Sequence, residues 1–328
     1  MAAFLTSLLS LALVVFTALS LELNFYRNSC PQAEAVVRKA VEEHFLRDPS
    51  IPAGLLRLHF HDCFIRGCDG SVLLDSNGNN IAEKEAPPNL SLRGFEVIDE
   101  IKGKLERECR GTVSCADILA LATRDGVAIS GGGTYDLPTG RRDGTVSTIT
   151  DVHLPDPASS VADAVAAFQT INLTLADLTT LLGAHSVGFC HCLFFIDRLY
   201  DFKGTGFPDP DMDPTTLDIL RKKCPRPTTQ IFNISSDPKV FMNQMSSTPF
   251  TLDNSFFHSI LNGRAVLQLD QELGFTDLTS NLLARYSTRP GAFRWMFAKS
   301  MIKLGNVGVL TGQAGEIRLN CREVNQRH

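Results

Sequence analysis

The stretch GLLRLHFHDCFIRGCDGS, residues 54–71, carries the densest polar chemistry in the chain. Arg57 and His61 are four positions apart, so on an α-helix they lie on one face and can converge on one small ligand. An imidazole can take a proton from one oxygen of a peroxide and return it to the other, while a guanidinium stabilises the negative charge that develops. Such a pair is also common on solvated helix faces, so it indicates this chemistry only together with other signals.

The second half of the stretch has the composition of a cation-binding loop. Five positions can offer oxygens, three through side chains and two through carbonyls: Asp62, Asp69 and Ser71, then Ile65 and Gly67. Calcium takes about six to eight oxygen ligands, so we expect a calcium ion here. A bridge between the two cysteines that bracket the loop would hold its shape.

Zinc binding by His59, His61 and Cys63 is the alternative interpretation of this stretch. It is unfavourable because alternate residues of a helix do not converge on one ion. Of the nine cysteines, only Cys190 and Cys192 lie within three positions of each other, so the paired C-x-x-C knuckles of a zinc ribbon are absent from the sequence.

The composition is that of a folded soluble protein with ample core: 328 residues, 44% hydrophobic and 20% charged. With about 150 residues per domain as a guide, this length predicts two lobes or one large domain. A net charge of −5 without a dense run of Lys or Arg argues against a protein that binds nucleic acid by neutralising phosphates.

Residues 1–20 are predicted to be a cleaved signal peptide. Leu8 to Leu19 form an apolar stretch shorter than the ~20 residues that span a bilayer, and small residues follow where a signal peptidase needs them. No later segment is long and apolar enough for a membrane anchor. We expect a mature chain, residues 21–328, secreted into an oxidising compartment where disulfides persist. Three N-x-[ST] sequons fit that route: Asn89, Asn172 and Asn233.

Helical signals recur along the mature chain. Pro31 is placed to open a helix whose apolar positions repeat at helical spacing: Ala33, Val36, Val37, Ala40 and Val41. Two pairs resemble capping boxes ahead of apolar runs: Ser114 with Asp117, and Thr174 with Asp177. Residues 291–304 form a further amphipathic run, and no alternating β pattern of useful length appears. The sequence therefore predicts a large, mainly α protein.

Several motifs in a fixed order resemble the secretory plant peroxidases, the class III haem peroxidases. Residues 54–71 resemble the distal signature of that family, and the likeness runs from NFYRNSCP at Asn24 to IRLNCREVN ending at Asn325. Blocks between them include AEKEAPPN, RGFEVID, VSCADILALATRD, GRRDG, LPDP, LGAHSVG, DRLY and DQEL. The resemblance implies a haem peroxidase fold of about ten or more helices with little β. A distal half, roughly 21–150, and a proximal half, roughly 151–328, would sandwich the haem.

The activity that the resemblance implies is that of a donor:hydrogen-peroxide oxidoreductase with haem b. It would reduce hydrogen peroxide to water and oxidise small phenolic donors in one-electron steps through a ferryl intermediate. Pro155, by its backbone, and Phe194 match donor-contact positions. We expect a monomer in the extracellular space or cell wall. Two alternatives stay open: an oxidase-type haem enzyme that acts on indoles or generates radicals, and a non-catalytic secreted calcium-binding scaffold.

On the distal side the resemblance assigns His61 as the acid–base group, Arg57 as its electrostatic partner and Phe60 as a residue beside the haem. Asn89 matches the residue that accepts the other ring proton of the distal imidazole, with support from Glu83. Because this role would bury and occupy the Asn89 side chain, we expect its sequon to carry no glycan.

On the proximal side His185, in LGAHSVG, matches the fifth ligand of the iron. Leu175, Leu178, Leu182 and His185 fall on one helical stripe, so the imidazole is expected to project from an apolar face. A lone histidine on such a face is usually a satisfied core residue, and it is the resemblance that favours the ligand role. Asp270, in LDQEL, matches the carboxylate that accepts the proximal ring proton and makes the imidazole more electron-rich.

The resemblance implies two calcium sites, the distal one at the five positions named above. A second, proximal site would draw on Ser186, Thr248, the Thr251 carbonyl and Asp253. Three residues before Thr248, where the family has an aspartate, this chain has Met245. A thioether cannot replace a carboxylate for a hard cation, so we expect the proximal site to be the weaker one.

Spacing alone leaves the pairing of the cysteines open. The resemblance implies four bridges: Cys30–Cys109, Cys63–Cys68, Cys115–Cys321 and Cys192–Cys224. It leaves Cys190, in FCHC, without a partner. We interpret Cys190 as a buried free thiol in preference to a metal ligand or nucleophile.

Overall fold

The structure, a computed structural model, describes residues 20–326 except 79, 227–233, 235 and 245–247. Met245, Asn233 and the expected signal segment up to residue 19 lie outside the described residues.

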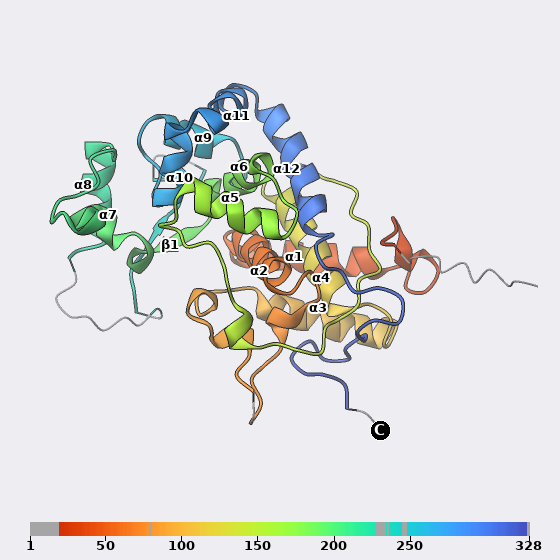
Figure 1. Ribbon diagram of the computed structural model, residues 1–328. Helices are drawn as coiled ribbons and strands as arrows, with labels where there is room; N and C mark the ends of the chain where they lie inside the picture. The colour runs from red at the N-terminus through yellow and green to blue at the C-terminus, as the bar shows by residue number, and fades with distance from the viewer. Residues whose placement is uncertain (1–19, 79, 227–233, 235, 245–247, 327–328) are drawn as a thin grey trace, which may run out of the picture.

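Helices make up almost all of the regular structure in the described residues, which confirms the mainly α prediction (Figure 1). The α-helices are α1 (Ala33–Arg47), α2 (Ile51–Ile65), α3 (Phe95–Glu108), α4 (Cys115–Ile129), α5 (Val161–Thr170), α6 (Leu175–Leu181), α7 (Ile196–Tyr200), α8 (Pro214–Lys223), α9 (Ser255–Leu261), α10 (Gln268–Glu272), α11 (Asp277–Thr288) and α12 (Pro290–Leu304). The short 3-10 helices are η1 (Phe25–Arg27), η2 (Ser71–Leu73), η3 (Glu83–Glu85), η4 (Pro87–Asn89), η5 (Ile149–Asp151), η6 (Leu182–Ser186), η7 (Cys192–Phe194), η8 (Phe202–Gly204) and η9 (Leu273–Phe275). Two short strands, β1 (Phe189–His191) and β2 (Lys239–Phe241), pair antiparallel.

The first long helix begins at Ala33, so the expectation that Pro31 opens it is wrong. The chain turns before the helix: the Ala33 amide donates to the carbonyl of Cys30 at 2.9 Å, and Cys30 is bonded to Cys109. The fully buried positions of α1 follow the expected apolar repeat: Ala33, Val37, Ala40 and Val41. Burial of this repeat holds α1 against α3 and α4.

The two predicted capping boxes differ in the structure. At α6 the box is complete, because the Thr174 hydroxyl accepts from the Asp177 amide and the Asp177 carboxylate accepts from the Thr174 amide. At α4 the Ser114 hydroxyl accepts from the Asp117 amide at 3.1 Å, but the Asp117 carboxylate turns to the Arg141 guanidinium at 2.7 Å. A buried ion pair therefore replaces the second half of that box.

Helix α2 lies between two apolar cores and contributes to both (Figure 1). Leu55 and Leu58 belong to the core that α2 shares with α1, α3 and α4. Leu56 and Phe64 belong to the core formed with α5, α6, α9, α11 and α12. The face that carries His61 is left between these cores, where it lines a cavity.

The chain changes from an α-helix to a 3-10 helix before it reaches His185. Helix α6 ends and the 3-10 helix η6 takes over, so the expectation of one α-helical stripe through His185 is wrong. Gly183 lies in this tighter turn, where a Cβ would come within 2.5 Å of the Phe293 ring. The period of about three residues in a 3-10 helix aligns Leu182 with His185, and both line the cavity.

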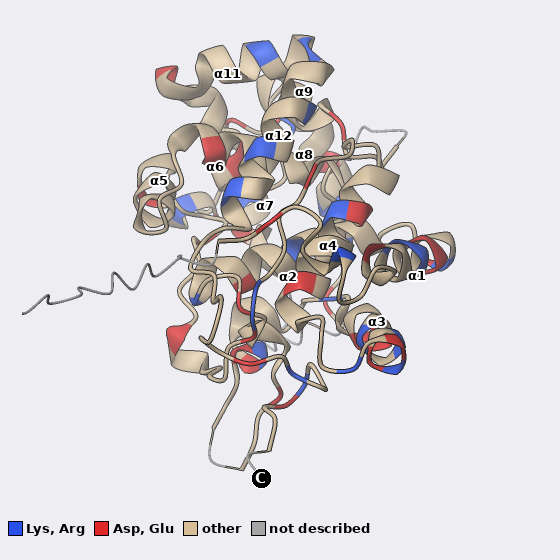
Figure 2. Ribbon diagram, turned by 90° about the vertical axis from the view of Figure 1, so that its right-hand side faces the viewer, with Lys and Arg blue, Asp and Glu red and all other residues tan. Residues whose placement is uncertain are grey.

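None of the described helices, taken singly, is long and apolar enough to cross a membrane. By length and composition only Val161–Thr170 and Leu175–Ser186 together would suffice, and these two segments are bent by 106°. Helices α1 and α3 carry interspersed acidic and basic residues (Figure 2). Among them, Lys104 pairs with Glu100 one helical turn away at 2.7 Å.

Candidate active site

A cavity of about 300 Å³ lies between α2 on one side and η6, α10 and α12 on the other. Much of its wall is apolar: Leu56, Phe168, Leu178, Leu181, Phe297, Met301 and Leu304. Its lining also brings together most of the residues expected around a haem: Arg57, Phe60, His61, Pro155, His185, Phe194 and Asp270. Segments more than a hundred residues apart in sequence therefore meet at one apolar space with a histidine on each side.

Two buried hydrogen bonds hold the His61 ring. Its Nδ1 lies 2.6 Å from Asn89 Oδ1, and Asn89 Nδ2 donates to the main-chain carbonyl of Glu83 at 2.7 Å. Because the asparagine oxygen only accepts, Nδ1 carries the proton and Nε2 is left as a free base. Glu83 supports Asn89 through its main chain, which leaves its carboxylate for another role.

Burial and a neighbouring cation keep this base neutral. Burial first, and then the Arg57 guanidinium, lower the pKa of His61 from 6.5 to about 3, against the opposing hydrogen bond with Asn89. Burial also lowers the pKa of Arg57 to about 10, so the guanidinium stays charged at neutral pH. It donates to the Ser91 hydroxyl at 2.8 Å and the Pro88 carbonyl at 2.6 Å. A neutral base beside a fixed cation can move a proton and stabilise the resulting charge.

On the other side of the cavity His185 is paired with Asp270. His185 Nδ1 lies 2.9 and 3.0 Å from the two oxygens of the Asp270 carboxylate. The Asp270 side chain is 1% exposed, whereas that of His185 is 32% exposed and lines the cavity. The carboxylate thus takes the Nδ1 proton and leaves Nε2 as the ring nitrogen available to a ligand.

Three buried carboxylates converge near the end of α2: Asp62, Asp69 and Glu83. Burial raises the pKa of Asp62, with the Asp69 carboxylate adding to the effect, and burial raises the pKa of Glu83 to about 7. Both Glu83 carboxylate oxygens and the Ser71 hydroxyl lack a hydrogen-bond partner among the described residues. Burying carboxylates costs free energy unless a cation binds to them. This set of oxygen donors therefore fits Ca²⁺.

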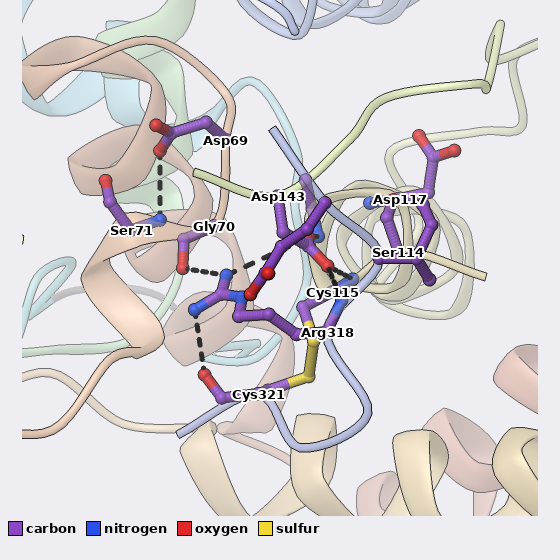
Figure 3. Close-up of polar contacts among 12 residues, drawn as sticks. Asp69, Gly70, Ser71, Ser114, Cys115, Asp117, Asp143, Arg318 and Cys321 are labelled. Carbon is purple, nitrogen blue, oxygen red and sulfur yellow. Dashed lines mark hydrogen bonds and ion pairs between the residues drawn. A yellow bond between two sulfur atoms is a disulfide. The ribbon is translucent and has the colours of Figure 1, made fainter. Parts of the chain in front are cut away.

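The loop with these groups is held from distant parts of the chain (Figure 3). Gly67 turns the loop with φ 97°, and a Cβ there would lie 2.6 Å from the Gly308 carbonyl, so only glycine fits. The fully buried Arg318 donates to the Gly70 carbonyl at 2.5 Å and lies 3.8 Å from Asp143. This arginine therefore fastens the cation loop to the C-terminal segment.

The residues expected at the proximal calcium site also meet. The Asp253 amide donates to the Ser186 hydroxyl at 3.3 Å, and the Thr251 amide donates to the Thr248 carbonyl at 3.0 Å. Ser186 is the last residue of η6 and follows His185 directly. The loop 248–253 is thereby joined to the segment that carries the proximal histidine.

The four disulfides join the pairs that the resemblance implies: Cys30–Cys109, Cys63–Cys68, Cys115–Cys321 and Cys192–Cys224. Cys190 is free, buried on β1 and part of the cavity lining, and burial raises the pKa of its thiol.

His59, Cys63 and Cys68 lie close together, but both of these cysteines are in a disulfide. The zinc alternative therefore fails, since zinc binds thiolates.

The Asn89 sequon is predicted to carry no glycan. Its side chain is 2% exposed, and both ends of its amide are hydrogen-bonded. Glycopeptide mapping of the protein from a eukaryotic secretory host checks this, and the exposed Asn172, in a turn with φ 60°, serves as the comparison. A glycan on Asn89 would contradict its role as the partner of His61.

Sequence reasoning missed several groups that shape the site. It assigned no role to Asp143 or Arg318, although both lie in motifs that it noted, GRRDG and IRLNCREVN. It also overlooked Ser91, which accepts from Arg57, and Lys239, which lines the cavity. For Asp143 and Arg318 the signal in the sequence was their charge, because charged side chains are almost never fully buried unless they are paired.

A mainly helical chain in which an Arg–His pair faces a carboxylate-bound histidine across an apolar cavity has the architecture of a haem peroxidase. The family described as Peroxidase matches residues 37–289. Peroxidase 57 of Arabidopsis thaliana is 48% identical over 305 residues, 93% of each chain. Peroxidase 28 of the same plant is 46% identical over 323 residues, which is 97% of this chain and 98% of that one. Peroxidase 5 of Vitis vinifera is 44% identical over 321 residues, 95% of each chain. The chain belongs to the secretory plant peroxidases, the class III haem peroxidases.

Proposed function

We propose that this peroxidase holds haem b between His61 and His185 and uses hydrogen peroxide to oxidise small phenolic donors, as a monomer in the extracellular space or cell wall. The observation that carries the proposal is the pair of oriented histidines on one cavity, His61 bound to Asn89 and His185 bound to Asp270. Four disulfides support secretion, since such bonds persist in oxidising compartments.

The residues present fit the group that the family implies. The walls of the cavity are mostly apolar, as a porphyrin requires, and His185 Nε2 is the free nitrogen that would hold the iron. When bound, haem would supply the redox chemistry, losing two electrons to peroxide and regaining them singly from donors. The Asp270 carboxylate would make the His185 imidazole more electron-rich and would fix its orientation.

The distal residues would handle the protons of the reaction. His61 Nε2 would take the proton from one peroxide oxygen and return it to the other, which leaves as water. Arg57 would stabilise the negative charge that develops between these two transfers. Asn89 holds Nδ1 and so keeps Nε2 unprotonated before peroxide arrives. Pro155 and Phe194, on the same cavity, would contact the donor ring.

The absorption spectrum of the haem-loaded protein, recorded before and after stoichiometric peroxide, tests the proposal. We expect a Soret band that shifts on addition of peroxide and returns when guaiacol is added. If haem binds and peroxide leaves the band unchanged, the proposed roles of His61 and Arg57 are wrong. If no haem binds with calcium present, the proposed site is wrong as a whole.

Calcium titration is expected to give two unequal affinities. The distal site would hold its ion with the buried carboxylates of Asp62 and Asp69, with Glu83 close by. In the sequence, Met245 stands where the family has an aspartate for the proximal site. Isothermal calorimetry on calcium-depleted protein measures both affinities. Met245→Asp is expected to tighten the weaker one by about tenfold and leave the stronger one unchanged. Equal affinities in the unaltered protein would contradict the assignment.

A further inference from the structure

The charges that line the cavity are predominantly positive. Among the described residues that line it are three permanent cations, Arg57, Arg93 and Lys239, and one carboxylate, Asp270. That carboxylate is occupied by His185. The chain as a whole carries a net charge of −5, so the cavity is a local positive region on an acidic protein. A field of this sign raises the local concentration of anions at the entrance.

Among these cations, Lys239 is exposed and free of carboxylate partners in the described part of the chain. Arg93, by contrast, pairs with Asp48. The Lys239 ammonium lies 5.0 Å from the centre of the Phe189 ring, which also lines the cavity. The ammonium is therefore held at the lip of the cavity beside an aromatic surface.

The strand pairing places the imidazole of a histidine next to this lysine. Lys239 on β2 is directly opposite His191 on β1, and His191 also lines the cavity. The next residues on the same face, Phe189 and Phe241, stack with their centres 4.8 Å apart, which fixes the register of the pair. The Asp237 carboxylate lies 3.7 Å from His191 Nδ1 and accepts a hydrogen bond from the Leu193 amide at 3.0 Å. Asp237 thus faces His191, and the lysine is left to bind an incoming anion.

The neighbouring lining suits a flat ring. Pro155, Pro157, Phe189 and Phe194 line the same cavity as Lys239. An apolar cavity with a cation at its entrance complements an aromatic ring that carries a carboxylate on a side chain.

We propose that Lys239, with His191 beside it, binds the carboxylate of the aromatic donor, so that this enzyme favours phenolic acids over uncharged phenols. The inference rests on the proposed function and names its donor class. Haem b itself carries two carboxylates, which are the other source of the same chemistry. The experiment must therefore separate binding of the donor from binding of the haem.

Steady-state kinetics with a hydroxycinnamic acid and its methyl ester measure the effect of the donor charge. Lys239→Gln is expected to raise KM for the acid by about threefold, and Lys239→Glu by about tenfold, with kcat unchanged. Lys239→Arg should keep the KM of the unaltered enzyme. KM for the ester should stay the same in all variants, and high salt should remove the preference for the acid. Lys39→Glu, which makes the same charge change at an exposed position of α1 away from the cavity, is the matched control and should leave both KM values unchanged.

Two outcomes would overturn the proposal. One is a KM for the acid that is the same in Lys239→Glu as in the unaltered enzyme, or that rises by the same factor in Lys39→Glu as in Lys239→Glu. The other comes from haem titration of the apoprotein and from the rate of haem transfer to an excess of an apo-acceptor. Faster haem loss in Lys239→Glu without a change in the acid-to-ester ratio would assign the lysine to the haem carboxylates. Guaiacol turnover by the unaltered enzyme is read separately, and its absence would overturn the proposed function itself.

Discussion

Leucine in place of His61 is expected to slow the reaction with hydrogen peroxide by about 10²- to 10⁴-fold. The substitution removes the free ring nitrogen of His61 beside Arg57 and puts an apolar side chain of comparable size in a site that is 5% exposed. Haem binding should persist, because His185 and Asp270 lie on the other side of the cavity. Stopped-flow recording of the Soret shift after one equivalent of peroxide measures the rate.

The control for this experiment is His258→Gln, an exposed histidine on α9 that does not line the cavity. It should react with peroxide at the rate of the unaltered protein. The resting spectrum of His61→Leu establishes that the haem is still bound. A His61→Leu protein that reacts with peroxide as fast as His258→Gln would contradict the acid–base role of His61.

The second large effect is expected from His185→Ala. Loss of a group that merely supports a metal ligand costs about 10- to 100-fold in affinity or activity, so loss of the ligand itself should weaken haem retention by at least about 100-fold. The cavity left by the ring should admit free imidazole, which is expected to restore part of the Soret absorbance. Haem titration with and without imidazole measures both effects.

Asp270→Asn is a milder variant that alters the partner of His185 and keeps the ligand itself. The amide keeps the shape of the side chain but no longer presents a carboxylate to His185 Nδ1, so a loss of activity of about 10- to 100-fold is expected with the haem retained. Far-UV circular dichroism on both apoproteins reports whether the helices have formed. If a folded His185→Ala protein holds haem as tightly as the unaltered one, His185 is not the axial ligand.

Local patterns predicted several of the helices and part of the site. The α1 repeat, the Thr174–Asp177 box and the Arg57–His61 pair each depend on residues three or four positions apart, which a helix brings together by its own geometry. The same reasoning failed at two ends of helices. Pro31 does not open α1, and the turn at Gly183 tightens the helix before His185. In each case contacts with distant residues decided the backbone.

The partners of the site residues come from far along the chain. His61 and Asn89 are 28 positions apart, His185 and Asp270 are 85 apart, and Arg318 and Asp143 are 175 apart. The likeness to a known family supplied the first two pairs, but no periodicity or spacing in the sequence indicates them. The third pair, and the position of Lys239 opposite His191, came only from the folded chain.

The sequence by itself determined the helical class of this protein, the oxygen-rich loop at residues 62–71 and the residue types that a peroxidase needs. Those features follow from local backbone geometry and from the chemistry of single side chains. The tertiary structure alone decided that Glu83 supports Asn89 through its carbonyl and that Arg318 fastens the cation loop. It also decided that Lys239 lies at the entrance of the cavity without a carboxylate partner among the described residues. Such contacts form when the apolar cores pack, because a buried polar group needs a hydrogen-bond partner. That partner can come from any segment that folding places beside it.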